Sequence, residues 1–579
     1  MRARILLIAA LAAVAALLAA SCGGGGVEEA EAPPPATTTG GETETPLPDT
    51  TTTATTEQPA EDIERGGILR IGSTDHIDSL NPFVAFNAQA YIAFVMTYPL
   101  LVQYGPGYVF EGDWAESWET SPDGLVWTFT VKPGSWSDGT PLTAEDGAWT
   151  CNTIVQYAKG PTASLAPFLS HVKECSAPDP QTLVVTYDEP VGNVLPQLQQ
   201  FFVLPKHVWE QHLGNDGKDL KKVRPEESLP LVAGGAFTIT KHEKKGATIY
   251  EKNPGFYGQE PYVDAVGLQI FTNEDAMVEA LRAGDLDAID ELPPNAVEAF
   301  ESDEAFDVTR SPGFQVNNFI FNSNPDKTKN RELLDPKVRE AFALAIDKQA
   351  IADTAYAGNA KPWASIVAEP AGDWLNPNLE PEPFDVALAN QILDEAGYAR
   401  GSGGIRVDQD GEKMSYEVIT PTGVQGINRE FEIARAGLEQ IGIEVTQKAL
   451  DDTTAFEEIG APDWKYLDFD LAMWDWVGYL DPDFVLSVVK CDQYGGWSDT
   501  GYCNPAYDEL YAQQGVTVDQ DARHEIVWEM QQILYDDRPY IQLVDLEYIT
   551  AYSTGWDGLQ PELAGFSKRP WTEAHQVAS

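Results

Sequence analysis

The segment from Trp114 to Trp149 constrains the fold most, because a strand, two turns and the start of a helix follow one another within it. Large apolar residues alternate with threonine from Trp127 to Val131, the period-two pattern of a half-buried strand. Pro122 to Gly124 and Ser137 to Gly139 are Gly-containing turn sequences on either side of this strand. Thr143 to Asp146 has capping-box spacing, which predicts a helix beginning there. The segment therefore predicts a hairpin-rich unit with a helix packed beside it.

The same segment resembles the signature region of the family 5 extracellular solute-binding proteins, the oligopeptide, dipeptide and nickel receptors of ABC importers. The resemblance extends in order through most of the chain, from GGILRIGSTDHIDSLNPF at Gly66 to VAGGAFTITKHEKKGATIYEKNPGFYG at Val232 and DPKVREAFALAIDKQAI at Asp335. It covers roughly Gly66 to the C-terminus. It implies an α/β chain with a type II periplasmic-binding-protein-like fold, in which two large lobes surround a cleft and a smaller domain is inserted.

About 510 residues follow the N-terminal segment, which is too many for one hydrophobic core. We therefore expect two or three domains. The resemblance implies three, with the first assembled from separated segments. The expected bounds are 65–100, 226–312 and 546–579 for domain I, 101–225 for domain II, and 313–545 for domain III.

Local patterns support an α/β organisation in the C-terminal half. Asp335 and Pro336 are a favoured N-cap and first residue of a helix, and an apolar stripe at helical spacing follows them. Ala387 to Tyr398 and Phe431 to Gln440 are further amphipathic segments, and the second is followed by a predicted strand at Ile443 to Thr446. Alternating helices and strands favour an α/β domain.

The N-terminus has the layout of a signal peptide. Arg2 and Arg4 precede an apolar run that ends in Leu18 to Cys22, which resembles a bacterial lipobox. We expect residues 1–22 to be a leader, Cys22 to be lipidated, and residues 23–64, rich in Thr, Pro and Glu, to be a disordered tether. Ordinary secretion with cleavage after a small residue is the alternative. The lipoprotein reading places the protein outside the cell, anchored to the outer face of the bacterial cytoplasmic membrane.

The formal net charge of −54 restricts the possible partners. Binding to nucleic acid or to anionic lipid needs a positively charged surface, so we expect no nucleic acid and no membrane contact beyond the lipid anchor. A well-solvated surface is one explanation of the charge. Attraction of cationic ligands is the other.

Four cysteines remain after Cys22. Four cysteines allow three pairings, and the nearest neighbours in sequence are Cys151 with Cys175 and Cys491 with Cys503. Export to an oxidising compartment favours these two disulfides over free thiols. Zinc is the competing explanation, but no closely spaced Cys or His group accompanies these cysteines, so we expect no metal.

The segment from Leu471 to Phe484, LAMWDWVGYLDPDF, resembles the cleft segment of the family. In that pattern an Asp, which binds the free amino group of a peptide, stands three residues before an Asp-Pro pair. Here Asp481-Pro482 supplies the pair, Gly478 stands at the amine-binding position, and Asp475 is the nearest candidate. The ligand residues expected from the resemblance are Trp474, Asp475, Trp476, Tyr479 and Trp497, together with Phe86, Asn87 and Ala88 in the loop after the first strand. Ordinary packing is the alternative for each of them.

Enzyme motifs are missing from the sequence, which has no Gly-x-Ser-x-Gly, no His-Glu-x-x-His and no Walker loop. We therefore expect a binding protein without catalytic residues or cofactors. The resemblance implies a monomer that captures peptides or a similar small solute and delivers them to an ABC permease with its ATPase. Three alternatives stay open: a sensor that does not transport, a binder of an oligosaccharide, opine or metal chelate, and a structural envelope protein.

Overall fold

The computed structural model describes residue 63 and residues 65–214, 216–563 and 565–577. The predicted leader, Cys22 and nearly all of the predicted tether lie outside these residues. Within the described ranges, the helices are too short or too polar to cross a membrane.

One sheet of eleven strands forms the centre of the fold. The order is β10-β11-β12-β1-β13-β19-β14-β18-β16-β17, and β15 pairs with β19. The strands are β1 Ile68–Ser73, β10 Phe237–His242, β11 Ala247–Lys252, β12 Ala265–Ile270, β13 Ala288–Ile289, β14 Phe306–Phe321, β15 Ala360–Pro362, β16 Ser415–Pro421, β17 Glu444–Leu450, β18 Leu471–Val477 and β19 Tyr540–Ser553. β1 runs parallel to β12 and β13, and β16 runs parallel to β17 and β18, whereas the long strands pair antiparallel. The sheet therefore has two parallel parts, β12-β1-β13 and β18-β16-β17, which are joined by a long antiparallel pair, and β10 and β11 extend the first part antiparallel.

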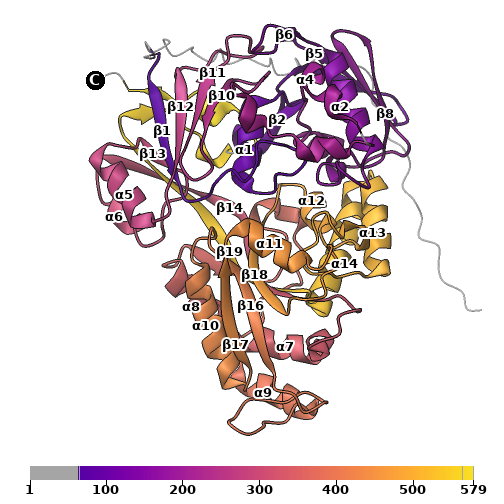
Figure 1. Cartoon of the computed structure of the whole chain (residues 1–579), viewed down its shortest axis with the longest axis vertical. Helices are drawn as coiled ribbons and strands as arrows, with labels where there is room; N and C mark the ends of the chain where they lie inside the picture. Colours follow the sequence, from indigo (N-terminus) through magenta and orange to yellow (C-terminus); the bar gives the residue numbers. More distant parts are fainter. Residues whose placement is uncertain (1–62, 64, 215, 564, 578–579) are drawn as a thin grey trace, which may run out of the picture. The chain divides into compact units, whose positions relative to one another are not determined.

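The pair β14 and β19 links the two parts of the sheet (Figure 1). One end of β19 pairs with β13, and the other end lies beside the part of β14 that pairs with β18. The register between the two strands shifts between Pro312 and Val316. Gly313 lies in this shift, and a Cβ there would be 2.0 Å from the Leu546 carbonyl oxygen, so only glycine fits. Both β14 and β19 thus run from one lobe to the other, and their pairing is irregular near Gly313.

The first lobe contains β1 and β10 to β13 with helices from the N-terminal half. Its helices are α1 Ala88–Thr97, α5 Glu274–Ala283 and α6 Val297–Glu301. The first strand of the chain, β1, precedes the segment that contains Phe86, Asn87 and Ala88. Asn273 caps α5 by accepting a hydrogen bond from the Ala276 N–H, and Gly284 ends the helix in the left-handed region.

A separate sheet of four strands, in the order β4-β5-β9-β8, contains the segment on which the sequence analysis centres. The strands are β4 Ala115–Thr120, β5 Val126–Val131, β8 Val172–Asp179 and β9 Thr182–Tyr187. Phe129 and Val131 of β5 are buried while Thr130 is exposed, so the predicted alternation is confirmed. Helix α2, Ala144–Gln156, begins where predicted, with the Thr143 N–H donating to Asp146 Oδ2 at 3.0 Å. A disulfide between Cys151 and Cys175 joins α2 to β8.

The second large lobe contains β16 to β18 and helices from residues 336–460. The helices are α7 Pro336–Ala345, α8 Lys348–Ala355, α9 Val386–Glu395, α10 Ile427–Gln440 and α11 Asp452–Gly460. Asp335 caps α7 as predicted, because its side chain accepts from the Lys337 N–H at 2.9 Å. The predicted apolar stripe from Val338 to Ile346 is fully buried in the core of this lobe.

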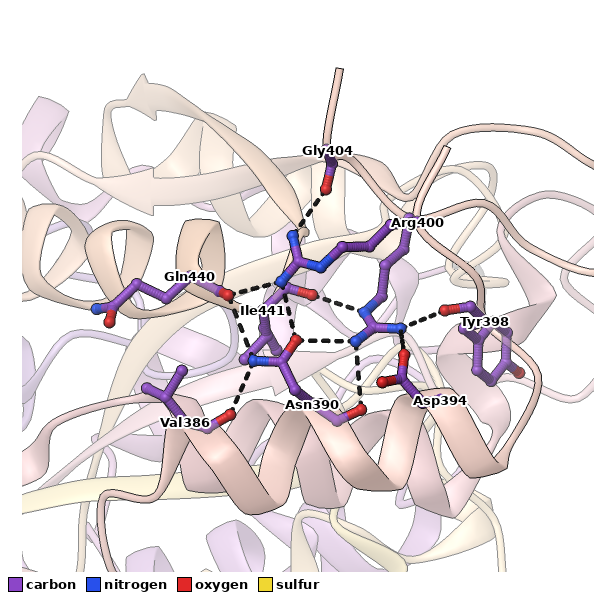
Figure 2. Close-up of polar contacts among 9 residues, drawn as sticks. Val386, Asn390, Asp394, Tyr398, Arg400, Gly404, Gln440 and Ile441 are labelled. Atoms are coloured by element: carbon purple, nitrogen blue, oxygen red, sulfur yellow. Dashed lines mark hydrogen bonds and ion pairs between the residues drawn. The ribbon is translucent and has the colours of Figure 1, made fainter. Parts of the chain in front are cut away.

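Asn390 and two arginines fasten the hairpin after α9 to the ends of α9 and α10 (Figure 2). Arg406 has no exposed surface, and it donates from Nε to the Ile441 carbonyl at 2.7 Å and from Nη1 to Asp394 Oδ1 at 2.6 Å. It also donates to the Tyr398 carbonyl and to Asn390. The more exposed Arg400 donates to Asn390 and to the Gly404 carbonyl.

Helices α13 Pro505–Val516 and α14 Gln520–Asp537 pack against each other, and α13 contacts a short helix, α12 Asp483–Ser487. A disulfide joins Cys491 and Cys503 just before α13. Asp481 accepts from the Asp483 N–H at 3.0 Å, as expected for a residue that fixes a turn. Its carboxylate also forms a two-point ion pair with Arg523 of α14.

Candidate functional site

A cavity of about 300 Å³ lies between the two large lobes. Its wall includes the segment from Phe86 to Ile92 and residues 290–292 from the first lobe, and residues 423–425 and 474–477 from the second. The region of β14 and β19 where the register shifts completes the wall. The volume is at the lower end of the range for ligand pockets, so the cavity suits a small solute.

All eight residues predicted to contact a ligand line this cavity, although they come from distant parts of the sequence. Three lie at the start of α1, three lie on β18, one follows β18, and one lies in the loop closed by the second disulfide. The eight are Phe86, Asn87, Ala88, Trp474, Asp475, Trp476, Tyr479 and Trp497. The fold therefore brings the predicted set together, and their contact with a ligand stays a prediction.

Aromatic rings from both lobes meet at the cavity. Phe86 stacks on Phe456 of α11 with ring centroids 5.3 Å apart, and Phe456 contacts Trp474 edge-on at 6.5 Å. Trp476 packs edge-on against Trp497 at 6.2 Å. These rings supply the apolar surface on which the body of a ligand could rest.

Some of the predicted residues are already held by protein partners. The Trp497 indole N–H donates to the Ser164 carbonyl at 3.0 Å, and that side chain is only 5% exposed. Asn87 Nδ2 donates to the His76 carbonyl at 3.2 Å. Trp476 Nε1 lies 3.2 Å from Asp499 Oδ2. Trp497 and Asn87 therefore have structural roles whether or not they contact a ligand.

The sequence analysis missed most of the carboxylates at the cavity. Eight acidic side chains line it, and only one of them was predicted. They are Asp75, Asp290, Glu291, Asp452, Asp475, Asp499, Glu547 and Glu562. Of the described residues that line the cavity, none is Lys, Arg or His. The cavity is thus acidic as well as aromatic.

A topological signal could have found three of these carboxylates. Asp290 and Glu291 follow β13 directly, and Asp75 stands two residues after β1. β1 and β13 are parallel neighbours, and ligands of open α/β sheets bind at the carboxyl ends of such strands. The two-residue strand β13 is too short to recognise from the sequence pattern, so this signal could not be read.

The acidic side chains raise one another's pKa. Burial, followed by the negative charge of Asp452, raises the pKa of Asp475 to about 7. Burial, followed by the charges of Asp290 and Asp475, raises the pKa of Glu291 to about 8. Burial also raises the pKa of Asp75 well above its usual range, with Asp452 and Glu291 adding to the effect. Removal of solvent and mutual repulsion both disfavour the charged forms.

Two further carboxylates have internal donors. Asp290 accepts from the Tyr548 hydroxyl at 2.7 Å and from Gln89, and its pKa is raised by burial. Asp499 accepts from the Tyr540 hydroxyl and from Trp476, and burial raises its pKa to about 7.

One group of side chains has the composition of a metal site. Asp75, His76 and Asp452 each offer a ligand atom, and these atoms lie within 4.8 Å of one another. His76 Nδ1 is 3.9 Å from Asp452 Oδ2, and burial lowers the pKa of His76. The sequence analysis expected no metal, and it did not consider this group.

Gly478 stands at the position where the family pattern has an amine-binding Asp. Gly478 donates its N–H to the Phe314 carbonyl at 2.7 Å, and its neighbours Val477 and Tyr479 line the cavity. Asp481 does not line it, because its carboxylate is held by Arg523. Asp475 is therefore the one carboxylate of this segment, residues 471–484, at the cavity.

The sequence matches a family model described as "Bacterial extracellular solute-binding proteins, family 5 Middle" over residues 109–496. It is 30% identical over 460 residues to Protein XP55 of Streptomyces lividans, covering 77% of this chain and 78% of that protein. It is 29% identical over 352 residues to a putative ABC transporter peptide-binding protein of Brucella ovis, covering 59% of this chain and 61% of that protein. The match thus spans about three fifths of the Brucella relative.

The fold resembles that of the oligopeptide-binding protein AppA from Bacillus subtilis, solved with a nonapeptide. The TM-score is 0.80 at 20% sequence identity, and the match covers 89% of this chain and 100% of that one. The similarity supports the expected fold class, two large lobes around a cleft with a smaller inserted domain.

Proposed function

Because this chain belongs to the family 5 extracellular solute-binding proteins, which bind solutes and are not enzymes, we propose that it captures peptides or a similar small solute for an ABC importer. The observation that carries the proposal is the acidic and aromatic cavity lined from both large lobes. The names of the Brucella relative and the Bacillus structure favour peptides among the possible solutes. The partners of the protein are then the solute and a permease with its ATPase, and the protein acts as a monomer.

The proposed mechanism is closure of the two lobes around the solute. The lobes are joined by the crossings in β14 and β19, and the expected domain boundaries at 312/313 and 545/546 fall beside the register shift in this pair. Strand segments with irregular pairing can absorb a change in backbone angles and act as a hinge. A solute that contacts both walls binds the closed state better than the open state and shifts the population toward it.

Removing one aromatic wall should weaken solute binding without unfolding the protein. We expect Trp474→Ala or Trp476→Ala to cost about 1 to 3 kcal/mol of binding free energy, because each loses one aromatic contact. Calorimetry with the solute that native mass spectrometry identifies in mildly purified protein measures this loss. Trp118→Ala is the matched control, since Trp118 lies on β4 outside the cavity and should leave affinity unchanged. Wild-type affinity in both cavity variants would contradict the proposed site.

Small-angle scattering tests the closing motion itself. The radius of gyration should decrease when the identified solute is added at saturation. A scattering profile that does not respond to a solute bound at saturation would contradict lobe closure.

We also propose that the mature protein is a lipoprotein that begins at Cys22. The arginines ahead of an apolar run and the lipobox-like Leu18 to Cys22 support this proposal. Cys22→Ala should block lipidation, so that the protein is no longer retained in the membrane fraction. Globomycin treatment of wild-type cells should cause the precursor to accumulate. Wild-type localisation and processing under both conditions would contradict the anchor.

A further inference from the structure

We propose that the solute of this cavity is a small organic cation with two or more positive charges and no carboxylate, held by Asp75, Glu291, Asp452 and Asp475. We call these four residues the acidic quartet. The inference rests on the proposed function, because it specifies the class of solute that the same cavity binds.

The acidic quartet contains two residues from each large lobe. Asp75 and Glu291 follow β1 and β13 of the first lobe, whereas Asp452 begins α11 and Asp475 lies on β18 of the second. All four line the cavity. Asp452, Glu291 and Asp475 each raise the pKa of at least one other member, so charges from the two lobes act on one another across the cavity. A cation between them would be attracted to both lobes at once and would favour closure.

Two members of the quartet have no partner in the protein. Within the part of the chain that the structure describes, the carboxylates of Glu291 and Asp475 receive no hydrogen bond or ion pair from another residue. Asp75 accepts from the His76 N–H at 2.7 Å, and Asp452 accepts from the Gly423 N–H at 3.0 Å. Unpaired carboxylates that are partly removed from water are stabilised by a positive partner, which the described residues do not supply here.

A second observation, independent of the quartet, indicates a ligand that donates hydrogen bonds. Gln200 lines the cavity and is only 2% exposed, yet its Oε1 has no donor within the described residues. Its Nε2 is already used, since it donates to the Gly565 carbonyl at 3.3 Å. A buried acceptor without a donor is unfavourable, and ammonium and guanidinium groups carry donors only.

The cations nearest to the cavity are not free to bind an anionic group. Arg310 is held by Glu301 at 2.8 Å and by Glu547 at 2.6 Å. Lys244 and Lys245 do not line the cavity. The carboxylate of an enclosed peptide would therefore have no Lys or Arg partner in the cavity wall, which favours a peptide-like solute without a carboxylate over a zwitterion.

The shape and walls of the cavity favour an organic cation over a bare metal ion. A volume of about 300 Å³ is far larger than one ion with its ligands. Trp474, Trp476 and Phe456 line it, and aromatic faces attract organic cations by cation–π interaction. The group of Asp75, His76 and Asp452 is the place where a metal ion would bind instead, so the test includes metal ions alone.

Two carboxylates of the acidic quartet are partly protonated when no cation is bound. The pKa of Asp475 is about 7 and that of Glu291 about 8, so both carboxylates are partly protonated near neutral pH. A bound cation favours the ionised forms and lowers these pKa values, so binding should release protons. Affinity should therefore rise as pH increases from about 6 to about 8.5.

The neighbouring charged groups do not reverse the expected rise of affinity with pH. Glu274 and Asp290 face Glu291, and both raise its pKa. Buried Glu430, with a pKa of about 7, interacts with Asp475. The pKa of His76 is lowered by burial, so it is neutral over most of this pH range.

Two nearby lysines and a tyrosine also leave the expected pH dependence unchanged. Lys244 and Lys245 act on His76 from the turn between β10 and β11, and both lower its pKa. Asp451 acts on His76 in the opposite sense. Tyr356 has a pKa raised well above its usual range by burial, so it stays neutral throughout.

The test uses three dipeptide probes that differ in charge, on ligand-free protein. They are the dipeptide amide Lys-Ala-NH₂ with two positive charges, the free acid Lys-Ala, and the uncharged N-acetyl-Gln-Ala-NH₂. We expect the amide to bind at least 100-fold tighter than the uncharged probe and at least 10-fold tighter than the free acid. Calorimetry in two buffers of different ionisation enthalpy should show proton release with the amide. Equal affinities, tighter binding of the free acid, or binding of Mg²⁺ or Ni²⁺ chloride without any of the dipeptide probes would overturn the proposal.

A double variant isolates the quartet. Glu291→Gln/Asp475→Asn should lose at least 50-fold in affinity for Lys-Ala-NH₂ and should release fewer protons on binding, while its fold should persist because repulsion is removed. Glu304→Gln/Asp307→Asn changes two exposed carboxylates outside the cavity and should bind like the wild type. Unchanged affinity and proton release in the cavity variant would overturn the proposal.

The two proposals fail differently. If the uncharged probe or the free acid binds at least as tightly as the amide and contracts the protein in small-angle scattering, the solute-binding function stands and the cation inference falls. If neither the probes nor a co-purified solute binds, the proposed function itself falls.

Discussion

Replacing Arg523 with Met is expected to lower the free energy of unfolding by about 3 to 5 kcal/mol. Only 1% of the Arg523 side chain and 8% of the Asp481 side chain are exposed, and the guanidinium binds both carboxylate oxygens. Without the arginine, Asp481 is left as a buried charge. Arg523 also donates to Gln514 at 2.8 Å, and Asn193 from the N-terminal half lies 3.4 Å from Asp481. The ion pair thus holds three separate segments of the chain together.

A double variant distinguishes the effect of breaking the ion pair from the effect of losing side-chain volume. Because paired buried charges contribute little net stability, Arg523→Met/Asp481→Leu should recover most of the loss. Arg435→Met is the surface control, since Arg435 pairs with Glu432 on an exposed helix face and should cost less than about 1 kcal/mol. Urea denaturation followed by fluorescence and by circular dichroism measures all three variants. A loss below 1 kcal/mol in the Arg523→Met protein would refute the expectation.

Local structure could be predicted wherever neighbouring residues determine it. The strand at Trp127 to Val131, the helix start after Thr143 and the cap at Asp335 are all confirmed, because each depends on residues within one or two turns. The sixteen-residue β14 could not be predicted. Its irregular register follows from pairing with β19, which lies more than 200 residues away, and from the close approach at Gly313.

The candidate site could be predicted in its aromatic half only. Trp474, Trp476 and Tyr479 lie within one recognisable segment, so their positions at the cavity could be inferred together. The acidic half is assembled by tertiary contacts between β1, β13, α11 and β18, and acidic residues are too common in this chain for any one of them to stand out. The Asp481-Pro482 pair could be recognised from the sequence, but the buried partner of Asp481, Arg523, gave no signal there.

Replacing Arg406 with Met should destabilise one end of the second large lobe more than any surface change there. Arg406 is fully buried and satisfies the carbonyls of Ile441, Tyr398 and Asn390 (Figure 2). Methionine fills similar space but leaves the Ile441 and Tyr398 carbonyls without this donor, whereas the Asn390 carbonyl lies within α9 and keeps its helical partner. Each buried unpaired acceptor costs about 1 to 3 kcal/mol, and partial access of water reduces the total, so we expect a loss of about 3 to 5 kcal/mol.

Hydrogen exchange locates this loss, since it reports opening of individual helices. The amides of α9 and of the end of α10 should exchange at least 100-fold faster in Arg406→Met, while β18 at the cavity should keep its protection and solute affinity should stay within twofold. Arg400→Met is the matched control, because Arg400 contacts Asn390 and Gln440 in the same network but is exposed, and it should change exchange by less than fivefold. Equal exchange rates in the Arg406→Met and Arg400→Met proteins would contradict this expectation. They would show that burial of the Arg406 guanidinium does not determine the stability of this region.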